Sequence, residues 1–203
     1  VAVAIVSMTD TGAAAPTPGA LDISQLLNTA PDDDGFNYYT DNGPSYGRWC
    51  GQTFTTGTNP AGYLLKSFAW KSSGNGNGFG VSQPYNLFLF SISPDGSRAT
   101  LLTRYKINSS GAEGNWLQWQ GLNVPLAPDQ TYAYTFGRDA GGTGWEHIGT
   151  QGGNPYAQGQ LITLSHTTGT GPVTYGTTEN SDATFNLGLI AYPSSAPRAS
   201  QPL

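Results

Sequence analysis

The chain has few charged residues: Asp, Glu, Lys and Arg make up 10% of its 203 residues, against about 25% in an average soluble protein. Only 8 residues are Lys or Arg, and the formal net charge is -5. Binding to nucleic acid needs a basic surface that neutralises phosphates, and so does binding to an anionic membrane surface. The composition therefore argues against both kinds of partner.

Cysteine and long apolar runs are also scarce. Cys50 is the only cysteine, which excludes an internal disulfide and a cysteine-rich zinc site. No apolar run approaches the roughly 20 residues of a membrane helix. Little Lys, an acidic balance and many Thr, Ser, Asn, Gly and Tyr are typical of exported proteins, so we expect a secreted, extracellular or cell-surface location.

Glycine and proline, in contrast, are abundant, with 28 and 14 residues. They divide the sequence into segments too short for a helical bundle or a βαβ enzyme. Between them lie runs rich in β-branched and aromatic residues, which are typical of strands: Val1–Met8, Gly51–Thr56, Tyr63–Trp70, Tyr85–Ile92, Ala99–Tyr105, Trp116–Trp119, Thr131–Phe136, Gln160–Leu164, Val173–Tyr175 and Ala183–Ile190. Such a series predicts an all-β, antiparallel sandwich or barrel.

The segments between these strands predict turns and loops. Thr9–Gly12 and Pro94–Gly96 are turn signals, and Asp22 is suited to cap one helical turn over Asp22–Leu27. Long Gly-rich loops are expected over 72–80 and 137–155. We expect residues 1–191 to form a single β-sandwich domain, and residues 192–203 to be a Pro/Ser-rich tail or linker.

Several aromatic residues are expected in the core. Trp119 alternates in phase with Leu117, and Trp70 with Phe68, so each pair shares one face of its strand. Tyr132, Tyr134 and Phe136 likewise form one stripe. These side chains are predicted to pack between the sheets.

Two stretches of the chain resemble segments common in exported bacterial β-sandwich proteins, some of which carry a C-terminal sorting signal. The first is Gly51–Gly57 followed by Tyr63–Ser67, and the second is Leu126–Tyr134. The similarity spans most of residues 1–190. It implies a secreted jelly-roll β-sandwich, similar in architecture to carbohydrate-binding modules, with the opening and closing strands side by side. It carries over no catalytic residue.

A structural calcium ion is a further expectation. In jelly-roll sugar-binding modules such an ion often lies near the paired terminal strands, and this resemblance places Asp10 and Asp182 there. Asp33, in the Asp32–Asp34 triplet, belongs to the densest negative charge of the chain, and three loop carboxylates attract a hard cation. The alternative is that Asp10 and Asp182 only cap turns and that the triplet is a solvated loop.

Aromatic and short polar residues in predicted loops indicate carbohydrate binding. Sugar faces carry C–H groups that pack on aromatic rings, while amides and carboxylates bind the hydroxyls. The chain contains five Trp and eleven Tyr. The candidate ligand-binding residues are Trp145, Trp116, Trp49, Tyr46, Tyr39, Asp41, Asn42, Glu146 and Arg138.

Catalytic candidates are few. Glu146 and His147, in the predicted loop over 137–155, form the most enzyme-like local pair. The alternative is a solvated Glu beside a hydrogen-bonding His. No His-Glu-x-x-His or phosphate-loop motif is present.

Three functions remain open. The first is a secreted, non-catalytic carbohydrate-binding module that recognises a polysaccharide or glycan. The second is a structural surface or matrix protein that self-associates when its N-terminal strand, Val1–Val6, pairs with a neighbouring sheet edge. The third is a glycan-cleaving enzyme that uses Glu146. We rank them in this order.

Overall fold

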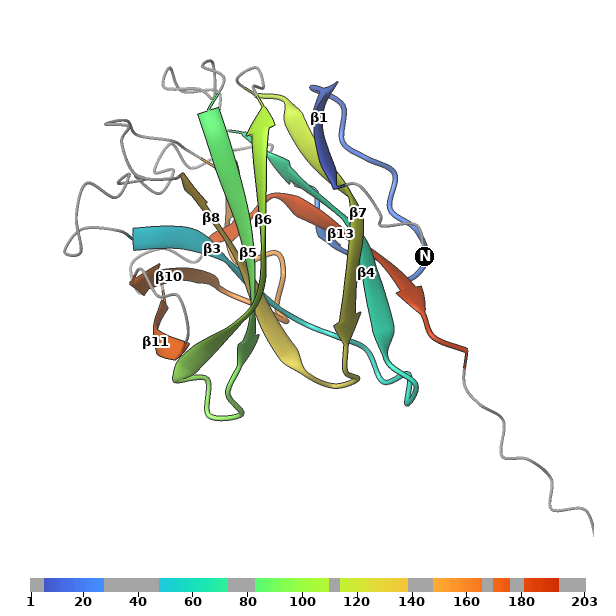
Figure 1. Cartoon of the computed structure of the whole chain (residues 1–203), viewed down its shortest axis with the longest axis vertical. Coiled ribbons are helices and arrows are strands. Elements are labelled where there is room, and N and C mark those ends of the chain that lie inside the picture. Colours follow the sequence, from blue (N-terminus) through green and yellow to red (C-terminus); the bar gives the residue numbers. More distant parts are fainter. Residues whose placement is uncertain are drawn as a thin grey trace, which may run out of the picture.

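The computed structural model describes residues 6–27, 48–72, 83–109, 114–138, 148–165, 170–175 and 181–193. Within these ranges the chain is all-β and its strands pair antiparallel, as the sequence predicts (Figure 1). The strands are β1 (Ser7–Gly12), β2 (Ile23–Gln25), β3 (Arg48–Thr55), β4 (Tyr63–Lys71), β5 (Gln83–Ile92), β6 (Arg98–Ser109), β7 (Trp116–Leu126), β8 (Thr131–Arg138), β9 (Thr150–Gly152), β10 (Leu161–Ser165), β11 (Thr170–Tyr175), β12 (Ser181–Ala183) and β13 (Phe185–Ala191). None of the described ranges contains a helix long and apolar enough to cross a membrane.

Eleven of the described strands form two layers, and β9 and β12 pair in a separate two-stranded sheet. One layer is a five-stranded sheet in the order β1-β7-β4-β13-β2. The other runs in the order β10-β11-β6-β5-β8-β3 and closes on itself where β3 pairs with β10. Figure 1 shows β4, β7 and β13 on one side and β3, β5, β6 and β8 on the other. The arrangement is sandwich-like, whereas the jelly-roll order itself stays a prediction.

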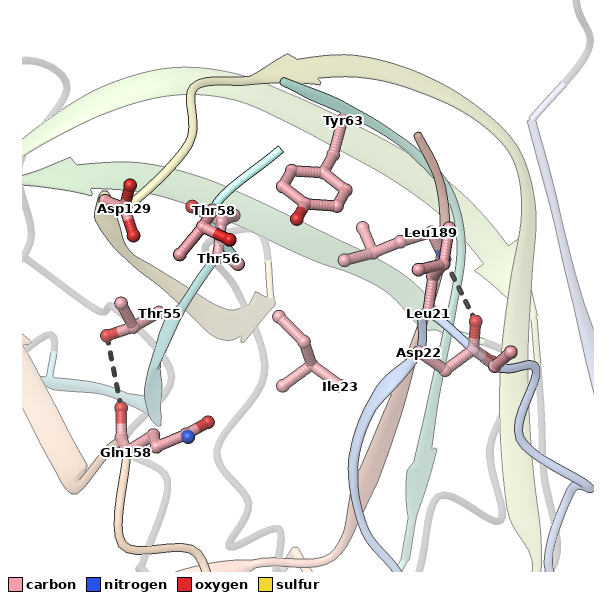
Figure 2. A pocket seen from close by; sticks show the side chains of 12 residues that line it. Leu21, Asp22, Ile23, Thr55, Thr56, Thr58, Tyr63, Asp129, Gln158 and Leu189 are labelled. Carbon is pink, nitrogen blue, oxygen red and sulfur yellow. Dashed lines mark hydrogen bonds between the residues drawn. The ribbon is translucent and has the colours of Figure 1, made fainter. Parts of the chain in front are cut away.

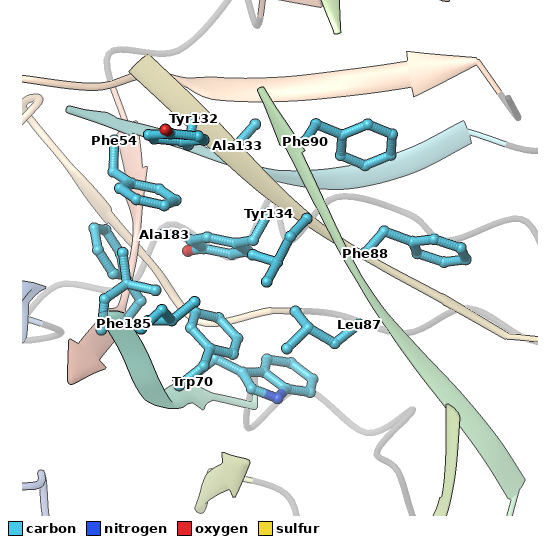
Figure 3. Close-up of a cluster of buried hydrophobic side chains, with 14 of the residues drawn as sticks. Phe54, Trp70, Leu87, Phe88, Phe90, Tyr132, Ala133, Tyr134, Ala183 and Phe185 are labelled. Carbon is cyan, nitrogen blue, oxygen red and sulfur yellow. The ribbon is translucent and has the colours of Figure 1, made fainter. Parts of the chain in front are cut away.

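Aromatic side chains from both layers fill the space between the sheets, some of which appear in Figure 3. The ring centroids of Phe68 and Tyr134 lie 4.4 Å apart, and those of Trp70 and Phe136 lie 4.4 Å apart as well. Trp119 is fully buried. Alternation of large apolar side chains along β4, β7 and β8 therefore produces one aromatic core, and the core residues predicted from the sequence are confirmed.

Three local predictions are wrong. Residues 23–25 form the edge strand β2 instead of a helical turn, because their backbone pairs with Phe185–Leu187 of β13. Thr9–Gly12 belongs to β1, which pairs with β7. Thr150–Gly152 forms β9 within the loop expected over 137–155, because it pairs with β12.

The opening and closing strands are not neighbours either. Of the predicted strand Val1–Met8, the structure describes Val6, Ser7 and Met8. Ser7 and Met8 are the first two residues of β1. β1 lies at one edge of the five-stranded sheet, and β7 and β4 separate it from β13. The expected pairing of the terminal strands is therefore wrong for β1 and β13.

The connection between β1 and β2 crosses the five-stranded sheet. These two strands form opposite edges of the sheet, and the core fills the inner face, so residues 13–22 must pass over the outer face. At the end of this crossing, the Asn186 side-chain amide of β13 donates a hydrogen bond to the Asp22 carboxylate over 3.0 Å. We call residues 13–22 the crossing segment. Its last residues lie at one end of the molecule.

Candidate functional site

A pocket of about 560 Å³ opens at this end of the molecule, where the crossing segment meets the ends of several strands. Its volume lies within the range of about 300–1,000 Å³ that is usual for small-ligand sites. Six parts of the chain contribute to it: the crossing segment with β2, the end of β3 and the following loop, the start of β4, the turn between β7 and β8, the loop before β10, and β13. The lining residues are Ala20, Leu21, Asp22, Ile23, Thr55, Thr56, Gly57, Thr58, Tyr63, Asp129, Gln158 and Leu189.

One wall of the pocket is apolar. Leu21, Ile23 and Leu189 lie together at one side, and the buried ring of Tyr63 continues this wall (Figure 2). The Tyr63 hydroxyl accepts a hydrogen bond from the Asn59 N–H over 3.1 Å, which fixes the direction of the ring. This side of the pocket is therefore a preformed surface of aliphatic and aromatic carbon.

Glycine is required beside this ring. A Cβ atom at Gly57 would collide with the Tyr63 hydroxyl. Any larger residue at position 57 would displace either the loop or the ring. Gly57 thus allows the loop after β3 to pass close to the apolar wall.

The opposite wall is polar. Thr58, Asp129 and Gln158 are exposed, and Figure 2 shows Thr58 and Asp129 across the pocket from Leu21 and Leu189. Thr55 joins the wall to the loop before β10, since its hydroxyl donates to the Gln158 carbonyl over 3.3 Å. A hydroxyl, a carboxylate and an amide thus face the apolar surface, and together they can accept and donate hydrogen bonds.

The backbone holds Asp129 in a defined position. Its φ of 49° lies in the left-handed region, which Asp tolerates better than most residues. The Asp129 N–H donates to the Gly57 carbonyl over 2.9 Å. Beside it, Thr56 Oγ1 donates to the Ala127 carbonyl over 2.7 Å and accepts from the Gln130 N–H over 3.1 Å. These bonds fasten the β7–β8 turn to the loop after β3, so the backbone of Asp129 is held at the pocket.

Asp22 is the second carboxylate of the pocket, and its oxygens accept hydrogen bonds from the protein itself. One oxygen accepts from the Gly19 N–H over 2.9 Å and from the Asn186 amide, and the other accepts from the Leu189 N–H over 3.1 Å. Asp22 therefore closes a turn and anchors the crossing segment to β13, in place of the helix cap expected from the sequence.

A buried polar cluster supports the polar wall from behind. Asp182 is 0% exposed, and its carboxylate accepts from Gln52 Nε2 over 2.6 Å and from the Tyr156 N–H over 2.7 Å. Gln52 Oε1 of the same side chain in turn accepts from the Ala183 N–H over 3.1 Å. The Tyr156 hydroxyl accepts from the Thr55 N–H over 3.4 Å. Asp182 therefore holds the segment that carries Gln158, and Tyr156 links that segment to β3.

Burial governs the protonation of this cluster. Desolvation raises the pKa of Asp182 above its ordinary value of 3.8, against the opposing effect of the hydrogen bonds from Tyr156 and Gln52. Burial also raises the pKa of Tyr156 to about 12. The pKa of Tyr134, whose buried hydroxyl has no hydrogen-bond partner among the described residues, is raised by burial and, to a smaller extent, by the nearby Asp182. Because Asp182 has no contact with solvent, it acts as an anchor and not as a ligand-binding group.

The structure corrects one predicted ligand-binding residue, Trp116. Its side chain is 1% exposed at the start of β7, where Trp116 lies opposite both Gly12 and Lys71. The ring is buried and presents no face to a sugar.

Two of the other predicted ligand-binding residues lie in described strands. Trp49 lies in β3 opposite Leu164, and Arg138 ends β8 opposite Tyr85, although it was expected in a loop. The remaining candidates fall outside the described residues: Trp145, Glu146, His147, Tyr39, Tyr46, Asp41, Asn42 and Asp33. Their roles stay predictions.

The two described calcium candidates lie apart. Asp10 accepts hydrogen bonds from the Gly12 N–H over 2.8 Å and from Asn115 Nδ2 over 3.0 Å. It lies on the edge strand β1, three strand spacings of about 4.8 Å from β13, whereas Asp182 lies on β12. Within the described ranges, no three His, Cys, Asp or Glu side chains form a group that could hold a metal ion. Calcium binding stays a prediction.

The pocket residues were missed because the sequence presents them as ordinary turn residues. Thr58 follows a predicted strand, and Asp129 lies in a Pro-Asp turn. A usable signal was present in the strand pairing. In an antiparallel pair, the end of one strand lies beside the start of its partner, and Thr55 indeed lies opposite Thr131. From this rule, the loop after β3 and the turn before β8 could have been predicted to lie side by side.

Comparisons with known proteins identify no relative of this chain: no family model, curated protein or solved structure matches it.

Proposed function

We propose that this chain is an exported, non-catalytic carbohydrate-binding protein and that the pocket is its glycan-binding site. The observation that supports this proposal is the division of the pocket into two walls. Leu21, Leu189 and Tyr63 offer carbon surface, and Thr58, Asp129 and Gln158 offer polar groups across from it. A sugar ring has the same division, with C–H groups on its faces and hydroxyls around its edge.

The carboxylates of the pocket favour binding over cleavage. Glycosidases generally use two carboxyl groups that flank the scissile bond. Among the described lining residues, Asp22 accepts three hydrogen bonds from the protein, and Asp129 is the remaining carboxylate. An enzymatic role of Glu146 stays the competing hypothesis. Release of reducing ends or unsaturated products from a polysaccharide panel would favour that hypothesis.

The binding test combines a glycan array and pull-down on insoluble polysaccharides with pocket variants. Leu21→Ala should weaken binding by about fivefold or more, because it removes part of the carbon surface, a loss of about 1 kcal/mol. Gln158→Ala should weaken binding by a similar factor through the loss of its amide.

Leu102→Ala is the matched control for Leu21→Ala. Leu102 on β6 is 44% exposed, close to the 46% of Leu21, but it does not line the pocket. If the two leucine variants bound glycan with equal affinity, the pocket would not be the glycan-binding site. Absence of any glycan ligand, together with concentration-dependent polymerisation in size-exclusion chromatography, would favour the self-associating structural protein instead.

A further inference from the structure

The charge of the pocket defines a class of ligand. Of the described residues that line it, the charged ones are Asp22 and Asp129, and none is basic. The whole chain also has a formal net charge of -5. A ligand entering the pocket therefore meets negative charge without a compensating cation among these residues.

We infer that the pocket selects neutral, hydroxyl-rich saccharides and rejects their uronic-acid counterparts, and that Asp129 is the residue that sets this selectivity. This inference rests on the proposed function. Asp22 has little capacity left, because donors from Gly19, Asn186 and Leu189 occupy its carboxylate. Asp129 is exposed, and its turn is fastened to the loop after β3.

The chemistry of a carboxylate explains the selectivity. Its two oxygens only accept hydrogen bonds, so they can bind two neighbouring hydroxyls of a neutral sugar. A uronate replaces the C6 hydroxymethyl group with a second carboxylate, which brings no donor and repels Asp129. The hydrogen bond from the Asp129 N–H to the Gly57 carbonyl holds the backbone of Asp129 beside the pocket, so the side chain starts from a fixed position.

The test uses matched oligosaccharides of equal length and linkage that differ at C6. Three pairs serve as probes: β-1,4-linked glucose and glucuronate, β-1,4-linked mannose and mannuronate, and α-1,4-linked galactose and galacturonate. Affinities are measured by calorimetry at low salt. We expect at least one neutral oligomer to bind, and its uronate counterpart to bind about tenfold more weakly or worse, equivalent to about 1.4 kcal/mol.

Asp129→Asn removes the charge and keeps a residue type that tolerates a left-handed backbone. It should reduce the tenfold preference to about threefold or less. Asp95→Asn is the control, because it removes one exposed carboxylate at the turn between β5 and β6, outside the pocket. It should leave the preference unchanged. Raising the ionic strength to about 1 M, where the screening length falls to about 3 Å, should also reduce the preference.

The possible failures can be told apart. Uronates that bind the wild-type protein as tightly as the neutral oligomers overturn the charge selection and leave glycan binding intact. An unchanged preference in Asp129→Asn removes the role of that residue. If neither member of any pair binds, the proposed function fails, and this inference fails with it.

Discussion

The core between the layers and the pocket at their end share several strands. β3 places Phe54 in the core and Thr55 at the pocket, whereas Leu189 of β13 and Tyr63 of β4 belong to the core cluster and also line the pocket. Where both layers cover a strand, large rings exclude water. Where the layers end, turns bring hydroxyl, carboxylate and amide groups to the surface. Stability and ligand binding should therefore respond to different substitutions.

The largest effect is expected in the core. Trp119→Ala should lower the free energy of unfolding by about 3–5 kcal/mol, because it removes a fully buried ring and leaves a cavity. Urea unfolding at neutral pH measures this loss. Leu21→Ala at the pocket should change the same quantity by less than about 0.5 kcal/mol. Comparable losses in both variants would contradict the separation of core and pocket.

Asp182 connects the two regions, so its removal should affect both. Asp182→Ala leaves the Gln52 amide and the Tyr156 N–H without their acceptor, and an unsatisfied buried donor costs about 1–3 kcal/mol. Amide hydrogen exchange should also become faster at Tyr156 and Thr55, because the segment behind the polar wall loosens. Unchanged exchange at these amides would show that the pocket wall does not depend on Asp182.

The same carboxylate gives a pH dependence of defined sign. Because burial raises the pKa of Asp182 above 3.8, the native protein binds this proton at a higher pH than the unfolded chain does. The contribution of Asp182 to stability is therefore complete below pH 3.8 and is lost as pH rises through its native pKa. The stability of the wild type relative to Asp182→Asn should increase on acidification from neutral pH, by at most about 1.4 kcal/mol per pH unit.

Asp95 is a control for the pH dependence of stability, because its pKa is shifted in the opposite direction to that of Asp182. Hydrogen bonds from Ser93 and then Ser97 lower its pKa from 3.8 to about 2. Its contribution is present above pH 3.8 and is lost as pH falls toward 2, so the relative stability of the wild type against Asp95→Asn should decrease in that window. Chemical denaturation between pH 2 and pH 7 measures both differences. Equal signs in the two series would contradict the burial of Asp182.

A smaller effect than in the core is expected where the crossing segment is anchored. Asp22→Ala removes hydrogen bonds from Gly19, Asn186 and Leu189 at a partly exposed site, and we expect a loss of about 0.5–1.5 kcal/mol. Limited proteolysis should then cut residues 13–22 faster than in the wild type. Asp95→Ala, which alters a turn far along the chain, should leave that cleavage rate unchanged.

Much of the fold could be predicted because it depends on local patterns. Phe68 and Trp70 share one face of a strand, and so do Tyr134 and Phe136, so their burial follows from alternation alone. Asp22–Leu27 was assigned wrongly because its short apolar pattern suits a helical turn as well as a strand. Pairing with β13, more than 150 residues away in the sequence, decided between them.

The sequence by itself determined the all-β class, the positions of most strands and the aromatic core, because strand periodicity and Gly/Pro breaks act over a few residues. Only the tertiary structure decided that Trp116 is buried, that Asp182 anchors a wall, and that Thr58, Asp129 and Gln158 face Leu21 across one pocket. The physical reason is that burial and juxtaposition depend on which distant strands pair. No local pattern specifies that choice, since a turn residue has the same sequence signature whether it faces solvent or a binding site.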